Sequence, residues 1–382
     1  MKLNPVDPGG GFIVSLPGNR IFRRNSILIG CAIAVALTGC GKHNASSQDS
    51  QSGNASTVNI LETGSSLLYP LFNLWVPAYK TQHPNVRITT QSTGSGTGMS
   101  QSIEGIAQVG ASDAYLSNTL QQMHSDMLNI PLAISMQMVN YNLPGLNGRH
   151  IKLSGPVLAA IYQGKIQKWN DRQIAQMNPG VKLPDHAIIP VHRSDGSGDT
   201  FIFTQYLAFS DPGWKNSLNY GTTVSWPPVS GGLGAVGNPG MLTAIKDNPY
   251  SIAYIGTSYQ DAIQNDGLGI AKLKNQAGNF LLPTAQTANA AAAVMVPKTP
   301  ANERISLIFA PGAQSYPIIN YEYAIVSSKQ RQPETATALR QFLTWAISQN
   351  GGNAPHFMHT VHFVPLPEPV VKLSQAQIAR IQ

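Results

Sequence analysis

Three short turns rich in Gly and Ser constrain this chain more than any other feature. They read Gly-Ser-Ser-Leu at residues 64–67, Gly-Ser-Gly-Thr-Gly at 94–98 and Gly-Ser-Gly-Asp-Thr at 196–200, and each leads from a strand-like run into a helix-like one. The first N–H groups of a helix lack intrahelical partners and carry the positive end of the helix dipole, so they bind an oxyanion without lysines. Three such helix starts predict a site for one oxyanion.

Each turn alone has a simpler interpretation, because Gly and Ser also form turns that bind nothing. Their comparable positions favour a site. Strand-like runs at residues 58–61 and 86–90 alternate with helical patterns, one capped by Ser66 and one over 99–107, and residues 109–113 resemble a third strand end. This alternation predicts a mostly parallel α/β sheet, in which ligands bind beyond the carboxyl ends of the strands.

The N-terminus has the pattern of a secretory signal peptide. Basic residues precede an apolar run at 26–37 that is short for a membrane span, and the residues before Cys40 resemble the lipobox at which lipoprotein signals are cut. We expect residues 1–39 to be a lipoprotein signal peptide and Cys40 to be the lipidated first residue of the mature chain. An ordinary signal or an uncleaved anchor is the alternative, and the export route, general or twin-arginine, stays open.

The mature chain is expected to form no intramolecular disulfide and to bind no polyanion. Cys31 lies in the segment to be removed, so Cys40 is left without a partner for an intramolecular disulfide. Residues 1–39 carry a net charge of +3, and their removal lowers the formal charge from +7 to +4. The basic residues neither cluster nor alternate with aromatic ones, which argues against nucleic-acid binding. Residues 41–56 are polar and small, which predicts a flexible tether.

The remaining 325 or so residues exceed what one hydrophobic core usually serves, which predicts two domains. Extended runs at 136–142 and 318–326 predict two crossings between them, and a helical pattern at 335–347 returns to the first. The predicted organisation is a discontinuous lobe 1 (57–138 and 321–382), an inserted lobe 2 (139–320) and a ligand cleft between them.

Two charged residues stand beside the turns. Arg193 offers a planar fork for an oxyanion, with a surface ion pair to Asp195 as the alternative. A carboxylate such as Asp113 is favourable beside an anion only if the anion carries a proton. An ionised carboxylate accepts a hydrogen bond from HPO₄²⁻ or H₂PO₄⁻, whereas sulfate offers it no donor. Its alternative is a helix cap in the following turn.

Catalysis has little support in the sequence. His356, His359 and His362 have helical spacing, but no local carboxylate or Cys completes a metal site, and the helix is expected to end near Val361. The chain has no nucleophile elbow in a triad context, and the turn at 94–98 lacks the lysine of a P-loop. We therefore predict no enzyme, no metal and no cofactor.

Several separated motifs together resemble the PstS family, the periplasmic phosphate-binding proteins of Pst-type ABC importers. The similarity runs from about Val58 to the C-terminus. The motifs lie at residues 110–113, 143–145, 164–169, 193–198, 317–320 and 339–345. The resemblance implies a type II periplasmic-binding-protein fold, with two α/β lobes joined by two hinge strands and the ligand in the cleft.

The resemblance also implies roles for individual residues. The expected phosphate ligands are Ser66, the backbone of Leu67, Ser95, Asp113 as proton acceptor, Arg193 as charged donor, the Ser197 hydroxyl and the Gly198 N–H. Two positions depart from the family pattern, which commonly has Thr-Phe where Ser66-Leu67 stands and Thr where Asp199 stands. Asp199 is expected either to accept a second ligand proton or to pair with Arg193.

The expected function is high-affinity binding of inorganic phosphate in the extracytoplasmic space and its delivery to the permease and ATPase subunits of an importer. The lipid on Cys40 would keep the protein, by default a monomer, at the membrane surface, with no nucleic-acid partner. Two other classes remain as alternatives: a surface adhesin or antigen, about which a sequence says little, and a phosphate-ester hydrolase, which needs a nucleophile with a base, or metals.

Overall fold

The computed structural model describes residues 57–382, which belong to one compact unit. The predicted signal peptide, the predicted lipidation site Cys40 and the tether up to residue 56 lie outside the described residues. Within the described part of the chain, no helix has both the length and the apolar character needed to cross a membrane.

The first lobe begins with alternating strands and helices, as predicted. In chain order they are β1 (Val58–Gly64), α1 (Tyr69–Gln82), β2 (Val86–Ser92), α2 (Ser95–Ile103), β3 (Val109–Ser112) and α3 (Asn118–Met123). β1 pairs in parallel with both β2 and β3. The carboxyl ends of these strands therefore share one edge of the sheet, where the first two Gly/Ser turns and Asp113 follow. Helix α2 begins four residues before the predicted start at Met99.

The apolar face of α1 joins this lobe to the end of the chain. Leu71, Phe72, Trp75 and Tyr79 recur at helical spacing and are buried. The ring of Trp75 lies edge-on to aromatic rings of α11 (Pro333–Ala346), the helix predicted at 335–347. Such pairs add about 0.5–1.5 kcal/mol each beyond the burial of their area. Two further helices complete the C-terminal part, α12 (Pro355–Thr360) and α13 (Glu368–Ile378).

Two long strands connect the lobes. β4 (Met127–Tyr141) and β12 (Ile319–Ser327) pair antiparallel, from Met136 opposite Ile319 to Met127 opposite Ser327. Every residue of β4 is buried, as expected for a strand covered on both faces. β12 also pairs with β3 of the first lobe, while the far end of β4 pairs with β8 (Ser251–Gly256) of the second. The predicted crossings at 136–142 and 318–326 correspond to parts of these strands.

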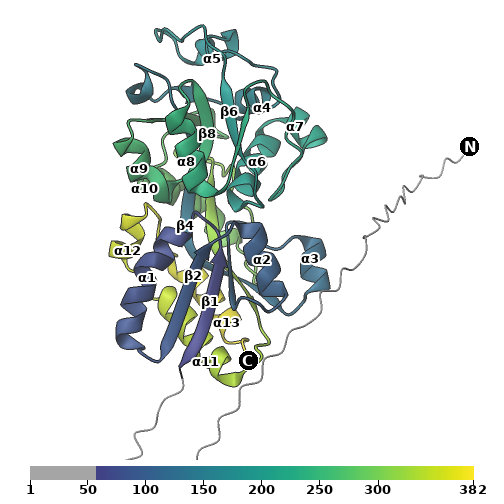
Figure 1. Ribbon diagram of the computed structural model, residues 1–382, viewed down its shortest axis with the longest axis vertical. Coiled ribbons are helices and arrows are strands. Elements are labelled where there is room, and N and C mark those ends of the chain that lie inside the picture. The colour runs from purple at the N-terminus through teal and green to yellow at the C-terminus, as the bar shows by residue number, and fades with distance from the viewer. Residues whose placement is uncertain (1–56) are drawn as a thin grey trace, which may run out of the picture. The chain divides into compact units, whose positions relative to one another are not determined.

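The second lobe repeats the strand–helix alternation (Figure 1). Its strands besides β8 are β5 (Lys152–Leu153), β6 (Ile189–Arg193), β7 (Leu233–Ala235), β9 (Gly269–Ile270), β10 (Lys272–Lys274) and β11 (Phe280–Leu281). Its helices are α4 (Gly155–Tyr162), α5 (Arg172–Met177), α6 (Gly198–Ser210), α7 (Pro212–Ser217), α8 (Gly237–Asp247), α9 (Gln260–Asn265) and α10 (Ala285–Met295), with 3₁₀ turns at Asn147–Arg149, Thr257–Tyr259 and Val296–Lys298.

The main sheet is mixed, which corrects the prediction of a mostly parallel one. Its order is β2-β1-β3-β12-β4-β8-β6-β7, with β9 paired to β4, and a small separate sheet holds β11-β10-β5. β1, β2 and β3 of the first lobe pair in parallel, as do β6, β7 and β8 of the second. In the main sheet, the pairs that β12 makes with β3 and β4, and those that β4 makes with β8 and β9, are antiparallel. The antiparallel pairs arise because the chain crosses between lobes through strands that run in opposite directions.

A segment before β12 also contacts the first lobe. The buried Glu303 carboxylate accepts hydrogen bonds from Ser374 and Gln377 of α13, both at 2.8 Å. Arg304 donates to the carbonyl of Leu116 at 2.9 Å, and Tyr323 donates to the Glu303 carbonyl at 3.0 Å. The predicted boundary at residues 320/321 assigns this segment to lobe 2, although the segment contacts lobe 1. The position of the boundary stays a prediction.

Candidate functional site

The three Gly/Ser turns each connect a strand to a helix, as the sequence predicts. The first lies between β1 and α1, the second between β2 and α2, and the third between β6 and α6. Ser95 is the first residue of α2, and Ser197 is the N-cap of α6, where its hydroxyl accepts from the Thr200 N–H at 3.2 Å. The second and third turns come from different lobes yet touch, because the Gly96 N–H donates to the Gly196 carbonyl at 2.8 Å.

Glycine is required where the turns approach one another. Gly94 has φ of 89°, and a Cβ there would lie 2.5 Å from a carboxylate oxygen of Asp195. A Cβ on Gly198 would lie 2.4 Å from Asp113 Oδ2 and 2.6 Å from Ser95 Oγ. Backbone of one lobe therefore packs directly against polar side chains of the other.

The first turn corrects the predicted cap by one residue. Ser65, not Ser66, accepts hydrogen bonds from backbone N–H groups, those of Leu67 at 3.1 Å and Leu68 at 3.0 Å, and α1 begins only at Tyr69. Ser66 instead faces the second lobe, where its hydroxyl accepts from the backbone and side-chain nitrogens of Asn238, both at 3.0 Å. Used as an acceptor twice, this hydroxyl still has its own proton to donate.

Asp113 follows the end of β3 and is buried. Ser65 donates a short hydrogen bond to its Oδ1, and Ser95 lies 3.4 Å from its Oδ2. The alternative role as a helix cap is excluded, because the cap of the following helix α3 is Ser117. Burial raises the pKa of Asp113, while hydrogen bonds from Glu322 and Ser65 and the charge of Arg193 oppose the rise.

Arg193, the last residue of β6, is held by two carboxylates. Its Nε and Nη2 donate to the two oxygens of Asp195 at 2.7 and 2.5 Å, and its Nη1 donates to Asp199 Oδ2 at 2.7 Å. The alternative prediction, an ion pair with Asp195, is therefore correct as to the partner. The pair is not on the surface, however, because the Arg193 side chain is only 1% exposed. Although burial favours neutral arginine, both carboxylates outweigh it and raise the pKa of Arg193.

Asp199 pairs with Arg193, one of the two roles predicted for it. Its Oδ1 accepts from Gln137 of β4 at 3.0 Å, and its Oδ2 accepts from Asn238 at 2.8 Å as well as from Arg193. Burial and the charge of Asp113 raise the pKa of Asp199 to about 7, against the pull of Arg193. Asp199 thus ties β6, α6, α8 and the connecting strand β4 together.

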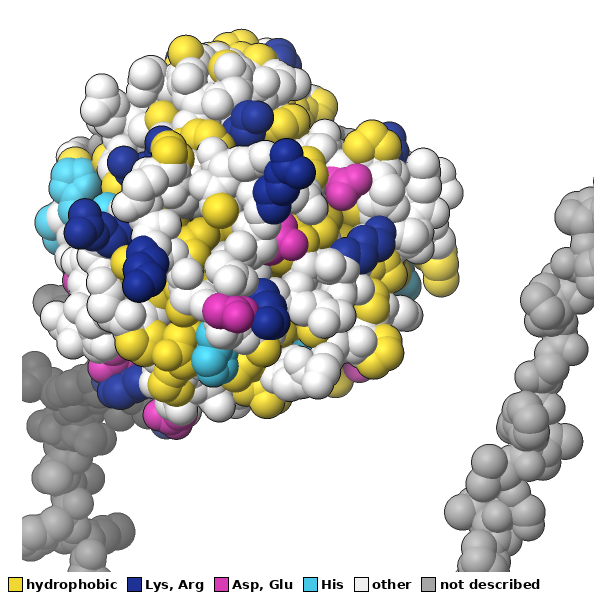
Figure 2. Space-filling view, turned by 90° about the horizontal axis from the view of Figure 1, so that it is seen from above, with side chains coloured by type: hydrophobic (Ala, Val, Ile, Leu, Met, Phe, Trp, Pro, Cys, Tyr) yellow, Lys and Arg dark blue, Asp and Glu magenta, His cyan; other side chains and the backbone are white. Residues whose placement is uncertain are grey.

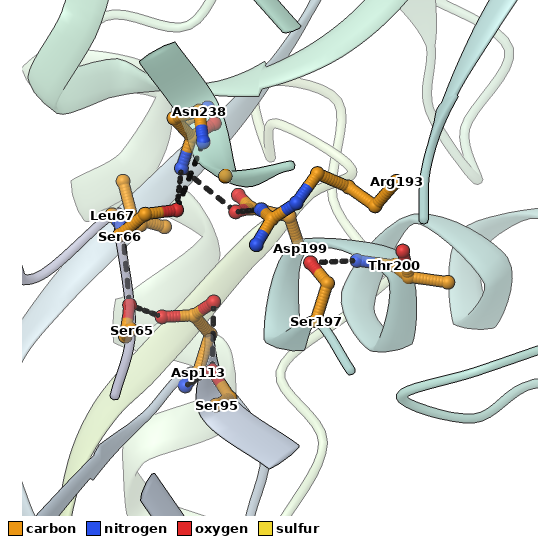
Figure 3. A network of polar contacts seen from close by, with 12 residues as sticks. Ser65, Ser66, Leu67, Ser95, Asp113, Arg193, Ser197, Asp199, Thr200 and Asn238 are labelled. Carbon is orange, nitrogen blue, oxygen red and sulfur yellow. Dashed lines mark hydrogen bonds and ion pairs between the residues drawn. The ribbon is translucent and has the colours of Figure 1, made fainter. Parts of the chain in front are cut away.

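Figure 3 shows how these groups are arranged. Ser65, Ser66, Ser95 and Asp113 lie on the side of the first lobe, and Arg193, Ser197, Asp199 and Asn238 lie on the side of the second. The predicted residues Ser66, Leu67, Ser95, Asp113, Arg193, Ser197, Gly198 and Asp199 are all brought together. The arrangement combines hydroxyl and N–H donors, one arginine and one buried acceptor at the junction of the lobes.

Sequence reasoning missed Ser65, Gln137, Asn238 and Glu322. Asn238 had a usable signal, because Gly-Asn-Pro-Gly at residues 237–240 follows strand β7 and opens α8, as the three recognised turns do. Glu322 had another, since it is the lone acid in the apolar run of β12. Gln137 carried no signal, because one amide in a buried strand points to no particular partner.

Neither the face in Figure 2 nor the histidines of residues 57–382 show a second cluster of charged or metal-binding side chains. On the face of the second lobe in Figure 2, Lys and Arg side chains stand among uncharged and acidic ones. In residues 57–382, no cluster of three or more His, Cys, Asp or Glu side chains is placed to hold a metal ion. Helix α12 ends at Thr360, as expected, and His362 beyond it pairs with Asp261 at 2.7 Å.

Known proteins are similar to this chain in sequence. A family model described as a PBP superfamily domain matches residues 47–350. Phosphate-binding protein PstS of Pasteurella multocida is 38% identical over 318 residues, which cover 83% of this chain and 89% of that protein. Phosphate-binding protein PstS of Methanocaldococcus jannaschii is 33% identical over 378 residues, 93% of this chain and 95% of that protein.

A solved structure agrees with the fold. The high-affinity periplasmic phosphate-binding protein PfluDING, determined with bound phosphate, superposes with a TM-score of 0.65 at 20% identity, over 84% of this chain and 93% of that one. Together with the family model, this likeness confirms the predicted type II periplasmic-binding-protein fold, with two α/β lobes and two connecting strands.

Proposed function

The chain belongs to the PstS family of phosphate-binding proteins, and we propose that it is a high-affinity, extracytoplasmic receptor that binds inorganic phosphate and delivers it to an ABC importer. The relatives named above are phosphate-binding proteins, and the solved neighbour holds phosphate. Delivery requires contact with the permease of the importer, which would recognise the form with the lobes closed.

One observation carries this proposal: a buried carboxylate, Asp113, lies among donors that suit an oxyanion. The donors we assign to phosphate are the hydroxyls of Ser66, Ser95 and Ser197, the N–H groups of Leu67 and Gly198, and the guanidinium of Arg193. Arg193 and the helix starts neutralise the charge of the anion. Asp113 accepts a hydrogen bond from the P–OH group, which sulfate lacks at neutral pH. With sulfate, the Asp113 carboxylate and a sulfate oxygen would face each other with no proton between them. This unpaired contact costs about 1–3 kcal/mol or more of binding free energy, so the site rejects sulfate.

Asp199 and Asn238 support the same site from the second lobe. Asp199 fixes the Arg193 guanidinium, and Asn238 bonds both Asp199 and Ser66. We propose that the bond from Asn238 to Ser66, which joins the two lobes, forms as the lobes close around phosphate and exclude water from it. Because the pKa of Asp199 is raised to about 7, the protonation of this carboxyl group changes near neutral pH.

We assign the protein to transport, not to catalysis. Hydrolysis of a phosphate ester requires an activated nucleophile, and none of the hydrogen bonds described for residues 57–382 joins a serine hydroxyl to a histidine. The purified protein is expected to release no p-nitrophenol from p-nitrophenyl phosphate. Steady release, lost in Ser65→Ala, would contradict the assignment.

The proposed attachment to the membrane rests on the sequence before residue 41. Cells fed labelled palmitate are expected to label the protein, and Cys40→Ser should abolish the label. A single acyl chain binds membranes weakly, so stable attachment needs more than one chain. Labelling that persists in Cys40→Ser would contradict the lipoprotein assignment.

Isothermal titration of the purified protein tests the function directly. The protein is first unfolded and refolded to remove any carried-over ligand, then titrated with phosphate and with sulfate at the same pH. We expect tight binding of phosphate and none of sulfate. Equal binding of both anions would contradict the proton-based selectivity, and binding of neither would contradict the receptor function.

A further inference from the structure

Glu322 is a third buried carboxyl group at the site, and the binding scheme above does not use it. It lies on β12, one of the two strands that connect the lobes, and its side chain is fully buried. Its Oε1 accepts from the Ser135 hydroxyl of β4 at 2.5 Å. Its Oε2 is buried and accepts no hydrogen bond from any of the described residues.

The fold directs this side chain toward Asp113. β12 pairs with β3, with Tyr323 opposite Ser112, the residue before Asp113. Asn320, on the same face of β12 as Glu322, donates from its side chain to the Asp113 carbonyl. The register between β12 and β4 shifts between Glu322 and Tyr323. Such irregularities re-aim side chains next to functional sites.

Two adjacent buried carboxylates cannot both be ionised without a large cost, so one of them keeps a proton. Asp113 has three groups that favour its charge: the hydroxyls of Ser65 and Ser95, and Arg193. Glu322 has only Ser135, and the charges that face it, those of Asp113 and Asp199, are negative. This asymmetry favours Glu322 as the group that keeps the proton.

The main elements packed against β12 add no further titratable group beside Glu322. Of the elements packed against β12, neither α2, α10 nor β3 contains a titratable side chain, and β4 contributes only Tyr141 at its far end. Burial, the charge of Asp113 and the hydrogen bond shared with Asp113 raise the pKa of Glu322 well above its usual range. A neutral acid also gives the unpartnered Oε2 a role, as the donor to Asp113.

We propose that Glu322 is a positioning residue of the anion site: its carboxylic acid keeps its proton and donates a hydrogen bond to Asp113, so that Asp113 meets the ligand as an ionised acceptor. This inference rests on the proposed phosphate-binding function. It assigns part of the selectivity to a residue that does not touch the ligand. That residue lies on a connecting strand, so Asp113 is already ionised before the lobes close.

Two variants separate this role from a packing role. Glu322→Gln keeps a donor for Asp113 and an acceptor for Ser135 and cannot lose a proton, whereas Glu322→Leu removes the donor. Without it, Asp113 itself retains a proton at lower pH and can donate to sulfate. Phosphate and sulfate affinities are measured by titration calorimetry from pH 5 to 8 for the wild type, both variants and the remote control Glu303→Gln.

We expect Glu322→Gln and Glu303→Gln to keep the wild-type ratio of phosphate to sulfate affinity within about threefold at every pH. Glu322→Leu should lower that ratio by about tenfold or more at pH 5, with recovery toward pH 8 as Asp113 ionises. A Glu322→Leu ratio that follows the wild type at every pH, or a Glu322→Gln variant that loses selectivity, overturns the inference.

A spectroscopic measurement covers the case in which Glu322→Leu does not fold. The infrared difference spectrum of wild type minus Glu322→Gln at pH 7 should contain the stretch of a protonated carboxylic acid. A carboxylate band in its place overturns the inference. Wild-type protein that binds neither anion would contradict the proposed function itself, whereas selective wild-type binding with no protonated acid on Glu322 contradicts only this inference.

Discussion

Asp113 has a chemical environment that few surface carboxylates share. It is buried, it accepts from Ser65, and it lies close enough to Gly198 of the other lobe that a Cβ there would clash with it. Its position at a Gly-Ala-Ser-Asp strand end was the sequence signal for the acceptor role, which stays a prediction. The groups that control its charge were not predictable, because Ser65 and Glu322 reach it only through the tertiary pairing of β1, β3 and β12.

Asp113→Asn tests the acceptor at the residue scale. The amide keeps the shape of the side chain but can offer a donor to the anion. Phosphate should bind about tenfold or more weakly, and the preference over sulfate should shrink, because the unmatched contact with sulfate is relieved. The two dissociation constants are compared by titration calorimetry. Unchanged selectivity would refute the role of Asp113.

Glu62 gives a prediction about stability and pH. Burial raises its pKa to about 8, although Thr90 and the backbone at Gln91 donate hydrogen bonds to it. An acid whose pKa is raised in the folded state stabilises the fold fully at low pH, and this contribution is lost as pH rises from about 4.5 to 8. Glu62→Gln removes that titration and should gain up to a few kcal/mol relative to the wild type between these pH values.

Urea unfolding of both proteins at pH 5 and pH 8 provides the measurement for Glu62. The difference in unfolding free energy between variant and wild type should grow in favour of Gln as the pH rises. Glu104→Gln, at an exposed position, controls for the loss of a negative charge. A difference that is the same at both pH values would show that Glu62 does not hold a proton in the folded protein.

At the scale of elements, the strand-to-helix turns were predictable because each combines a strand pattern, Gly and Ser, and a helical pattern in local sequence. Local sequence was less informative about which serine caps a helix. Ser66 was the wrong choice, because Ser65 has the geometry to accept from Leu67 and Leu68. The antiparallel centre of the sheet was also missed, since strand direction depends on where the chain crosses between lobes, which is a tertiary property.

Gly198→Ala tests the close approach of α6 to the first lobe. An added Cβ would lie 2.4 Å from Asp113 Oδ2, so closure should be obstructed and phosphate should bind about tenfold or more weakly. Gly240→Ala in α8 is the matched control, because its nearest neighbour, Ala235 Cβ, would lie at an ordinary 3.6 Å. Equal affinities for the two variants, with equal thermal stability, would contradict the predicted packing of α6 against Asp113.

At the scale of the whole described unit, hydrogen bonds link the two lobes at the site. Gly96 donates to Gly196 at 2.8 Å, Ser258 donates to the Leu67 carbonyl at 2.8 Å, and Asn238 donates to Ser66 at 3.0 Å. The sequence predicted two lobes and a cleft but not these contacts, because residues that meet across a cleft leave no periodic pattern. A ligand that binds both lobes shifts the population toward this closed arrangement.

Closure can be followed by small-angle X-ray scattering. The radius of gyration of the purified protein should fall when phosphate is added and stay unchanged with sulfate. Asn238→Ala removes a bond between the lobes, so it should weaken phosphate binding and reduce the fraction of closed molecules at a given phosphate concentration. A radius that does not respond to saturating phosphate would contradict closure on binding.

The most direct test of the site is a crystal structure of the protein grown with phosphate. The account predicts one phosphate between the lobes, with Ser66, Ser95, Arg193 and Ser197 donating to its oxygens and one oxygen within hydrogen-bond distance of the Asp113 carboxylate. A phosphate bound elsewhere, or one at this site with no oxygen in contact with Asp113, would contradict it.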